Sequence, residues 1–169
     1  RRIPWDVEAY LRRARAACFI CEMLAGNPDY AHHVVHRDDV GVVFLNRFPA
    51  VRGHLLVAPV DHRERCVEDF TEDEYIALQR VVHRAGRALG AVVPGERLYV
   101  VSLGSGQANR HVHWHVAPCP PGLPFEEQQW ALFLPERGYL ELAEAEWIEL
   151  AASLRGAMAS LTAPPAAAR

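Results

Sequence analysis

The chain contains no long apolar run and no basic track. None of its 169 residues belongs to a stretch near the ~20 uninterrupted apolar residues that span a bilayer, and Arg1 to Trp5 lack the apolar core of a signal peptide. The formal net charge is −3, and no run of five Lys or Arg provides a path for a nucleic-acid backbone. We therefore expect a cytoplasmic protein that contacts neither a membrane nor polymeric nucleic acid, although a mononucleotide ligand remains compatible with this charge.

Cysteine is also scarce. The four cysteines are too few to hold together a chain of 169 residues, half of which are hydrophobic and can build a core instead. We expect reduced thiols and a single domain over residues 1–169. Its core would cover about 18–118, followed by a C-terminal extension over about 119–161 and a frayed tail over 162–169.

The pattern of apolar residues predicts an α+β fold with an antiparallel sheet. Thr71 and Glu74 form the sequence pattern of a capping box, and Gly90 is the expected stop of the long helix that begins there. The prolines from Pro118 onward are expected to break the sheet. Strands are predicted at 40–46, 54–59, 97–103 and 111–116, and helices at 5–17, about 71–89 and about 141–160.

The last predicted strand carries three alternating histidines. Side chains on a strand alternate between faces, so His111, His113 and His115 share one face, roughly 6.5 Å apart. The residues between them are apolar and must pack against something, which argues against a solvated edge strand. Imidazole near its ordinary pKa of about 6.5 can act as nucleophile, acid–base group or metal ligand.

A glycine-rich loop precedes this strand. Gly104 to Gln107 lack the spacing of a Walker loop, but their backbone N–H groups can surround an anion next to the histidines. A histidine nucleophile beside such amides suggests phosphoryl or nucleotidyl transfer.

These residues resemble the histidine triad superfamily, and in particular its zinc-containing bacterial-type members. The hallmark His-x-His-x-His stands at 111–115 after Gly106 and Gln107. Further similarity lies in 44–49, in 53–59 and in Cys18 to Cys21, so that it covers about residues 18–118. The resemblance implies an antiparallel sheet of about five strands with a long helix, to which this chain adds N- and C-terminal helices.

The resemblance also implies roles for individual residues. His113 would form a covalent phosphoramidate with a nucleoside phosphate, His115 would contact phosphate oxygens and help protonate the leaving group, and His54 would lie beside the nucleophile. Asn46 would bind ribose hydroxyls, although it also suits a turn, and His54 also suits a satisfied core histidine. The phosphate would be held by loop residues, namely Ser105, Gly106, Gln107 and Asn109.

The activity that this resemblance implies is hydrolysis of a nucleoside phosphoramidate or a dinucleoside polyphosphate, with release of a nucleoside monophosphate. The ligand would be a purine nucleotide or another nucleoside phosphate. A phosphorylase or nucleotidyl transferase is an alternative, as is a regulatory module with little turnover. Ala108 departs from the Ser or Thr of many relatives, whereas His115 in place of Gln favours hydrolysis over transfer.

A second site is predicted from Cys18 and Cys21. Their two-residue gap suits half of a zinc site, at about 2.3 Å from the metal, although a redox dithiol and two buried cysteines are alternatives. The pair is expected to follow a helix rather than begin one, which argues against the redox pair. In the zinc-containing relatives the other ligands correspond to His62 and His111, so the resemblance implies a structural zinc that is not needed for the chemistry.

Other residues receive no functional role. His32, His33 and His36 lie in a predicted polar connector and His83 on a predicted helix. Cys66 and Cys119 are expected to be packing residues. By resemblance, the chain would form a homodimer through the long helix and a neighbouring strand.

Overall fold

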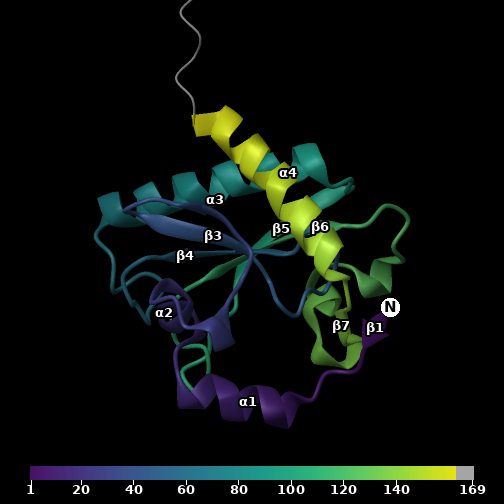
Figure 1. The fold of residues 1–169 in the computed structure, drawn as a ribbon, viewed down its shortest axis with the longest axis horizontal. Coiled ribbons are helices and arrows are strands. Elements are labelled where there is room, and N and C mark those ends of the chain that lie inside the picture. Colours follow the sequence, from purple (N-terminus) through teal and green to yellow (C-terminus); the bar gives the residue numbers. More distant parts are fainter. Residues whose placement is uncertain (163–169) are drawn as a thin grey trace, which may run out of the picture.

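The computed structural model describes residues 1–162, which form a mixed α+β structure around a five-stranded antiparallel sheet (Figure 1). The order of strands across the sheet is β2-β3-β4-β6-β5. The strands are β2 (Val34–Arg37), β3 (Gly41–Leu45), β4 (Leu55–Pro59), β5 (Arg97–Ser102) and β6 (Trp114–Cys119).

Two long helices cover one face of the sheet. In Figure 1, α3 (Glu72–Val92) and α4 (Glu144–Thr162) cross one another above the strands. Leu78, Leu89 and Leu154 are fully buried in the core beneath them, together with Trp114 from the sheet. The capping box of Thr71 and Glu74 is formed by both of its hydrogen bonds and fixes the start of α3.

Two shorter helices lie on the opposite face. Ile20 and Met23 of α2 (Phe19–Leu24) pack against Val42 and Phe44 of β3. The first helix, α1 (Val7–Ala16), has no fully buried residue, although Tyr10 and Leu11 are partly buried. It lies on the same side of the sheet as α2, farther from the strands, and contributes little to the core (Figure 1).

A small second sheet fastens the N-terminal segment to the C-terminal extension. In this two-stranded pairing, β1 (Arg2–Ile3) runs antiparallel to β7 (Tyr139–Leu140). Gly138 just before β7 has a φ of +66°, and a Cβ there would lie 2.2 Å from the Ile3 carbonyl oxygen. Only glycine fits so close an approach. We call the pairing of β1 with β7 the terminal clasp.

The structure corrects several sequence-based expectations. The prediction that Gly90 ends the long helix is wrong, since α3 continues to Val92 and ends where Val93 becomes extended before Pro94. The prediction that Pro118 breaks the sheet is also wrong, because it lies within β6. β6 pairs with β4 only as far as Val116. Pro118 lies beyond that point, so its missing backbone N–H is tolerated there.

Other differences concern the bounds of elements. The triad strand begins at Trp114 rather than at His111, and the C-terminal helix runs over 144–162 rather than 141–160. Among the helices and strands, α2, β1, β2 and β7 were not predicted, and β2 places His36 in a strand instead of a polar connector. The expected tail lies outside the described residues, apart from Thr162. Within the described part of the chain, no helix is both long and apolar enough to cross a bilayer.

Candidate functional site

The three triad histidines lie on the face of the sheet opposite to the main core. Val112, Trp114 and Val116 point into the core beneath α3, as their alternation predicts. His113 therefore lies on the α1 side, where it is 3% exposed and its ring centroid lies 5.0 Å from that of His115. The alternation is kept even though regular strand pairing begins only at Trp114.

One hydrogen bond fixes which nitrogen of His113 carries the proton. Nδ1 of His113 lies 2.7 Å from the carbonyl oxygen of His111, and a carbonyl can only accept, so Nδ1–H is the donor. Burial also lowers the pKa of His113, which favours the neutral ring. Nε2 therefore carries a lone pair and is a potential nucleophile.

His54 and His115 are hydrogen-bonded to each other, and each carries its proton on Nε2, unlike His113. The backbone N–H of Ala50 donates to Nδ1 of His54 at 3.2 Å, so the proton of neutral His54 is on Nε2. That nitrogen donates to Nδ1 of His115 at 2.9 Å. His115 is left with its proton on Nε2, as a hydrogen-bond donor beside the lone pair of His113.

Burial keeps this pair neutral. Desolvation lowers the pKa of His54 to about 3, and it also lowers the pKa of His115 well below its ordinary value. Both rings therefore remain uncharged at neutral pH. The sequence left open whether His54 is a core histidine or a site residue, and in the structure it is buried and hydrogen-bonded to His115.

Asn46 has the contacts of a turn residue and also lies beside the triad. Its Oδ1 accepts the backbone N–H of Phe48 at 3.0 Å, which closes the turn after β3. Its Nδ2 lies 3.3 Å from Nδ1 of His54, so the amide donates to that ring. The same side chain lines the cavities beside the triad.

Two adjoining cavities meet at His113 and His115. The first, of about 650 Å³, is bordered by α1 and carries two arginines at its rim, and we call it the arginine-rimmed cavity. The second, of about 660 Å³, lies under the C-terminal extension and has no Arg, Asp or Glu in its lining, and we call it the uncharged cavity. The C-terminal extension contributes Phe133, Leu134 and Gly138 to this lining and therefore covers part of the site.

The glycine-rich loop lies less close to the triad than its residues suggested. Ser105, Gly106 and Gln107 are exposed and do not line either cavity. Asn109 does line both, in a left-handed conformation with φ of 51°, and its amide contacts the hydroxyl of Tyr10. Within the loop, Gln107 donates its backbone N–H to the Ser105 hydroxyl at 3.2 Å.

The structure also brings in residues that sequence reasoning missed. His32, to which no role was given, lines the arginine-rimmed cavity and packs its ring on Phe19 and Phe44. From the N-terminal segment come Trp5 and Tyr10, which pack against Phe48. A cluster of aromatic residues near the N-terminus was the available signal, but it could not show which surface α1 covers.

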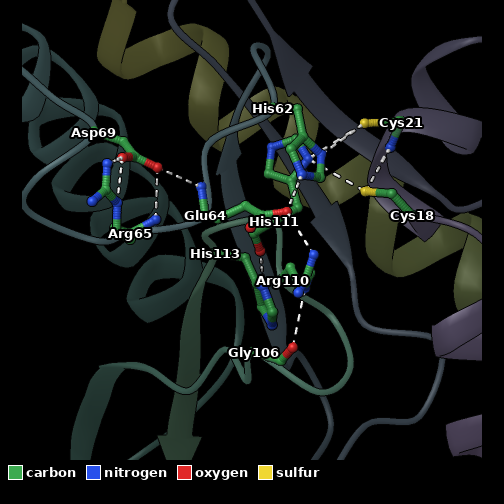
Figure 2. Close-up of polar contacts among 10 residues, drawn as sticks. All are labelled: Cys18, Cys21, His62, Glu64, Arg65, Asp69, Gly106, Arg110, His111 and His113. Carbon is green, nitrogen blue, oxygen red and sulfur yellow. Dashed lines mark hydrogen bonds and ion pairs between the residues drawn. The ribbon is translucent and has the colours of Figure 1, made fainter.

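The four predicted metal ligands converge at one point (Figure 2). Cys18, Cys21, His62 and His111 offer ligand atoms that all lie within 4.8 Å of one another. Nδ1 of His111 is 3.5 Å from Sγ of Cys18 and 3.6 Å from Sγ of Cys21. Nδ1 of His62 is 3.3 Å from Sγ of Cys21, so these residues can hold a metal ion.

Outer contacts orient both imidazoles of this cluster. His111 donates Nε2–H to the carbonyl of Pro59 at 3.0 Å, and His62 donates Nε2–H to the Glu64 carboxylate at 3.2 Å. Each ring then has a lone pair on Nδ1, directed at the thiols. Hydrogen-bonded outer partners of this kind are usual around metal-binding histidines, so the donor set fits a tetrahedral cation such as zinc.

The cysteine pair begins a helix, contrary to the sequence-based expectation. Cys18 is the N-cap of α2, and its Sγ accepts the backbone N–H of Cys21 at 3.5 Å. The pKa of the Cys21 thiol is nevertheless raised to about 11, first by burial and then by its hydrogen bond to Cys18. The position relative to a helix therefore no longer argues against a redox pair, and the metal site is favoured instead by the convergence of both thiols with His62 and His111. Cys66 and Cys119 pack in the interior, as expected.

The metal cluster and the triad are joined through His111. Its ring belongs to the cluster, whereas its carbonyl oxygen accepts the Nδ1–H of His113. A separate series of contacts joins the cluster to the glycine-rich loop. It passes from His62 to Glu64, whose carboxylate lies 3.6 Å from Arg110, and Arg110 donates to the Gly106 carbonyl at 3.0 Å (Figure 2).

Comparison with known proteins identifies the family. The model of the HIT domain matches residues 27–120, and the chain belongs to this family. Two curated relatives are uncharacterized HIT-like proteins. The one from Borreliella burgdorferi is 28% identical over 105 residues, which are 60% of this chain and 74% of the relative. The one from Saccharolobus solfataricus is 29% identical over 104 residues, which are 60% and 73%.

Two solved structures show the same fold. A hypothetical histidine triad nucleotide-binding protein from Sulfolobus tokodaii has a TM-score of 0.66 and 24% identity, over 85% of this chain and 93% of its own. A Zn-bound histidine triad family protein from Mycobacterium smegmatis has a TM-score of 0.65 and 21% identity, over 87% and 96%. Helix α1 and the cysteine pair precede the stretch that the HIT domain matches.

Proposed function

We propose that this protein is a nucleotide-processing hydrolase that releases a nucleoside monophosphate through a covalent intermediate on His113. The observation that carries this proposal is the 2.7 Å hydrogen bond from His113 Nδ1–H to the His111 carbonyl. It holds the proton away from Nε2 and so leaves a nucleophilic lone pair on a ring that borders both cavities. Family membership and the name of the Sulfolobus tokodaii neighbour, a nucleotide-binding protein, support a nucleotide as ligand.

In the first step Nε2 of His113 forms a bond to phosphorus while the bond from phosphorus to the leaving nitrogen or oxygen breaks. The leaving group needs one proton to depart neutral, and water at the site supplies it. The neutral His115 donates its Nε2–H as a hydrogen bond to the departing atom and keeps this proton, and His54 holds His115 in this tautomer through the 2.9 Å hydrogen bond. In the second step water attacks phosphorus, the Nε2–P bond breaks, and the proton that this water loses neutralises the hydroxide left from the first step. His113 Nδ1–H stays on the His111 carbonyl throughout.

The uncharged cavity indicates the kind of leaving group. During in-line displacement the leaving group departs on the side of phosphorus opposite Nε2 of His113, and the nucleoside is one of the other substituents on phosphorus, so the two extend in different directions. We therefore assign the nucleoside to the arginine-rimmed cavity and the leaving group to the uncharged cavity. A polyphosphate leaving group would bring several negative charges into a lining without Arg, and such charge needs cationic partners. An amine released from a nucleoside phosphoramidate suits the uncharged cavity better than the product of a dinucleoside polyphosphate.

We further propose that the metal is zinc and that it is structural. Two thiolates and two imidazoles are the donors that zinc favours, and the Mycobacterium smegmatis neighbour is a Zn-bound protein. Bound zinc would fix α2 and the segment after β4 to His111. Since His111 also orients His113, zinc would act on catalysis only through position.

The extension and the oligomeric state are also proposals. We infer one domain over the described residues, because α4 contributes Leu150, Leu154 and Met158 to the main core and Phe133 lines the site. We also propose a homodimer that pairs across β5, the strand at one edge of the sheet, where Val100 is 46% exposed. A monomer at micromolar concentration in light scattering would contradict the dimer.

The covalent step is tested by intact-mass measurement during turnover of an adenosine 5′-phosphoramidate. We expect the protein to gain the mass of one bound nucleoside monophosphate, and the His113→Asn variant to bind nucleotide without this gain. Asparagine keeps a side-chain N–H for the His111 carbonyl but has no nucleophilic lone pair. An adduct that forms normally on the variant would disprove the assignment, and nucleoside diphosphate formed in added phosphate would show phosphorolysis instead.

A further inference from the structure

Arg13 and Arg47 lie together at the rim of the arginine-rimmed cavity, although they come from distant parts of the chain. Arg13 belongs to α1, and Arg47 follows Asn46 in the turn after β3. Both guanidinium groups donate to one acceptor, the carbonyl oxygen of Asp29, with Nη1 of Arg47 at 3.1 Å. The two side chains therefore converge on the same place.

Within the described part of the chain, neither arginine forms an ion pair. The Asp29 carboxylate is not within 4.0 Å of either, and the nearby acids are engaged elsewhere, Glu141 with Arg1 and Glu144 with His33. No Asp or Glu lines the cavity that the arginines border. Two adjacent guanidinium groups repel each other unless an anion lies between them, so this arrangement suits a ligand that supplies one.

Arg13 is also held in place before any ligand arrives. Its guanidinium carbon lies 4.3 Å from the ring centroid of Tyr30, a cation–π contact that fixes the plane of the group. Arg15, two residues along α1, donates to the Gln107 carbonyl at 3.3 Å and Tyr10 contacts Asn109, so the helix itself is anchored over the cavity. Pre-ordered arginines lose little entropy on binding a phosphate with two hydrogen bonds.

The position of the pair relative to His113 indicates which part of a substrate it meets. This cavity offers aromatic faces for a base, among them Phe19 and His32, whereas the uncharged cavity is suited to the leaving group. With phosphorus at His113, the resemblance to the histidine triad superfamily implies that the ribose hydroxyls meet Asn46, and Arg47 is the next residue along the chain. The guanidinium groups thus face the nucleoside half of the substrate.

We propose that Arg13 and Arg47 form a subsite for a second phosphate, carried on the ribose of the nucleotide at its 2′ or 3′ position. The inference rests on the proposed function for the orientation of the nucleotide. Arg13 lies ahead of the stretch that matches the HIT domain, so this half of the subsite comes from the added N-terminal helix. The preferred substrate is then a ribose-phosphorylated nucleoside 5′-phosphoramidate.

The test compares binding of adenosine 5′-monophosphate with binding of the 2′,5′- and 3′,5′-bisphosphates and of adenosine 5′-diphosphate, by isothermal titration calorimetry. We expect one bisphosphate to bind about 10-fold more tightly than the monophosphate, as two charge-assisted hydrogen bonds allow. Arg13→Ala and Arg47→Ala should each remove most of this gain and leave the affinity for the monophosphate nearly unchanged. Arg12→Ala is the matched control, since exposed Arg12 pairs only with Glu8 on the same helix.

Two results would overturn the proposal. One is a gain for the diphosphate that depends on the arginines, with none for either bisphosphate, because the pair would then face the 5′ chain. The other is the same affinity for mono- and bisphosphates in the unaltered protein. Adduct formation on His113 is measured separately, so a protein that forms the adduct but shows no bisphosphate preference refutes only the subsite.

Discussion

The metal cluster and the triad pair use imidazole in opposite ways within a few residues of one chain segment. His111 and His62 both keep Nε2–H on an outer acceptor and direct Nδ1 at two thiols. His113 keeps Nδ1–H on a carbonyl and leaves Nε2 open to a cavity. The partner of one ring nitrogen thus decides the use of the other, and spacing along the strand does not.

Placing the same new residue at His113 and at His111 tests the division of roles between these two histidines most directly. His113→Cys should lower turnover by about 10⁴-fold or more, because the nucleophile and its hydrogen bond to His111 are lost together. His111→Cys keeps a metal-binding side chain and the backbone carbonyl, so turnover should stay within about 10-fold of the unaltered protein. Steady-state kinetics and metal analysis check both, and equal losses would refute the division of roles.

Removal of the metal should affect stability more than chemistry. Chelation, or Cys21→Ser, should lower the free energy of unfolding by about 4 kcal/mol or more, because loss of a structural metal leaves the cluster without its central contact. Denaturant unfolding with metal analysis measures this, and Cys66→Ser is the control, since Cys66 lies outside the cluster. An unchanged midpoint after complete chelation would show that the site is not structural.

Glu64 tests the outer contacts of the cluster. Glu64→Ala removes the acceptor of His62 Nε2–H and should weaken metal affinity about 10- to 100-fold. Competition with a metal indicator gives the affinity, and Glu68→Ala, an exposed acid nearby in the chain, should change nothing. Equal affinities of the two variants would mean that the Glu64 contact does not orient His62.

The pH dependence of stability tests the burial of His54. The pKa of His54 is about 3 in the folded protein and 6.5 ordinarily, so the unfolded chain binds more protons between these values. Stability from this group is therefore complete above about pH 6.5 and falls as the pH decreases toward 3. His54→Gln should show a shallower decline in pH-dependent unfolding, and a parallel decline would exclude His54 as its source.

The sequence was sufficient to predict features that depend on a short run of neighbouring residues. The capping box of α3, the alternation around His113 and the Cys18–Cys21 pair were predicted because each depends on fixed spacing, and the family resemblance added His62 and His111. It was insufficient where packing decides. Helix α2 has six residues, too few for a helical period, and β2 has four with a register shift between Val34 and His36.

Contacts between distant segments were the other limit. Nothing local in the sequence shows that α1 lies over the cavity, that His32 turns into it, or that Arg13 meets Arg47 at the Asp29 carbonyl. The exposed position of Ser105 to Gln107 was equally hidden, because a glycine-rich loop is compatible with several courses of the backbone.

The terminal clasp is a short attachment of the N-terminal segment that borders the cavities, and α1 beyond it is held by the contacts of Tyr10 and Arg15 with Asn109 and Gln107. Only two residue pairs join β1 to β7, and α1 behind them contributes no fully buried side chain. Segments with so few buried contacts open at a small fraction of the global unfolding free energy. Backbone amides of residues 2–16 should therefore exchange with solvent faster than those of β3 and β4, and the entrance to the cavities would follow the release of the clasp.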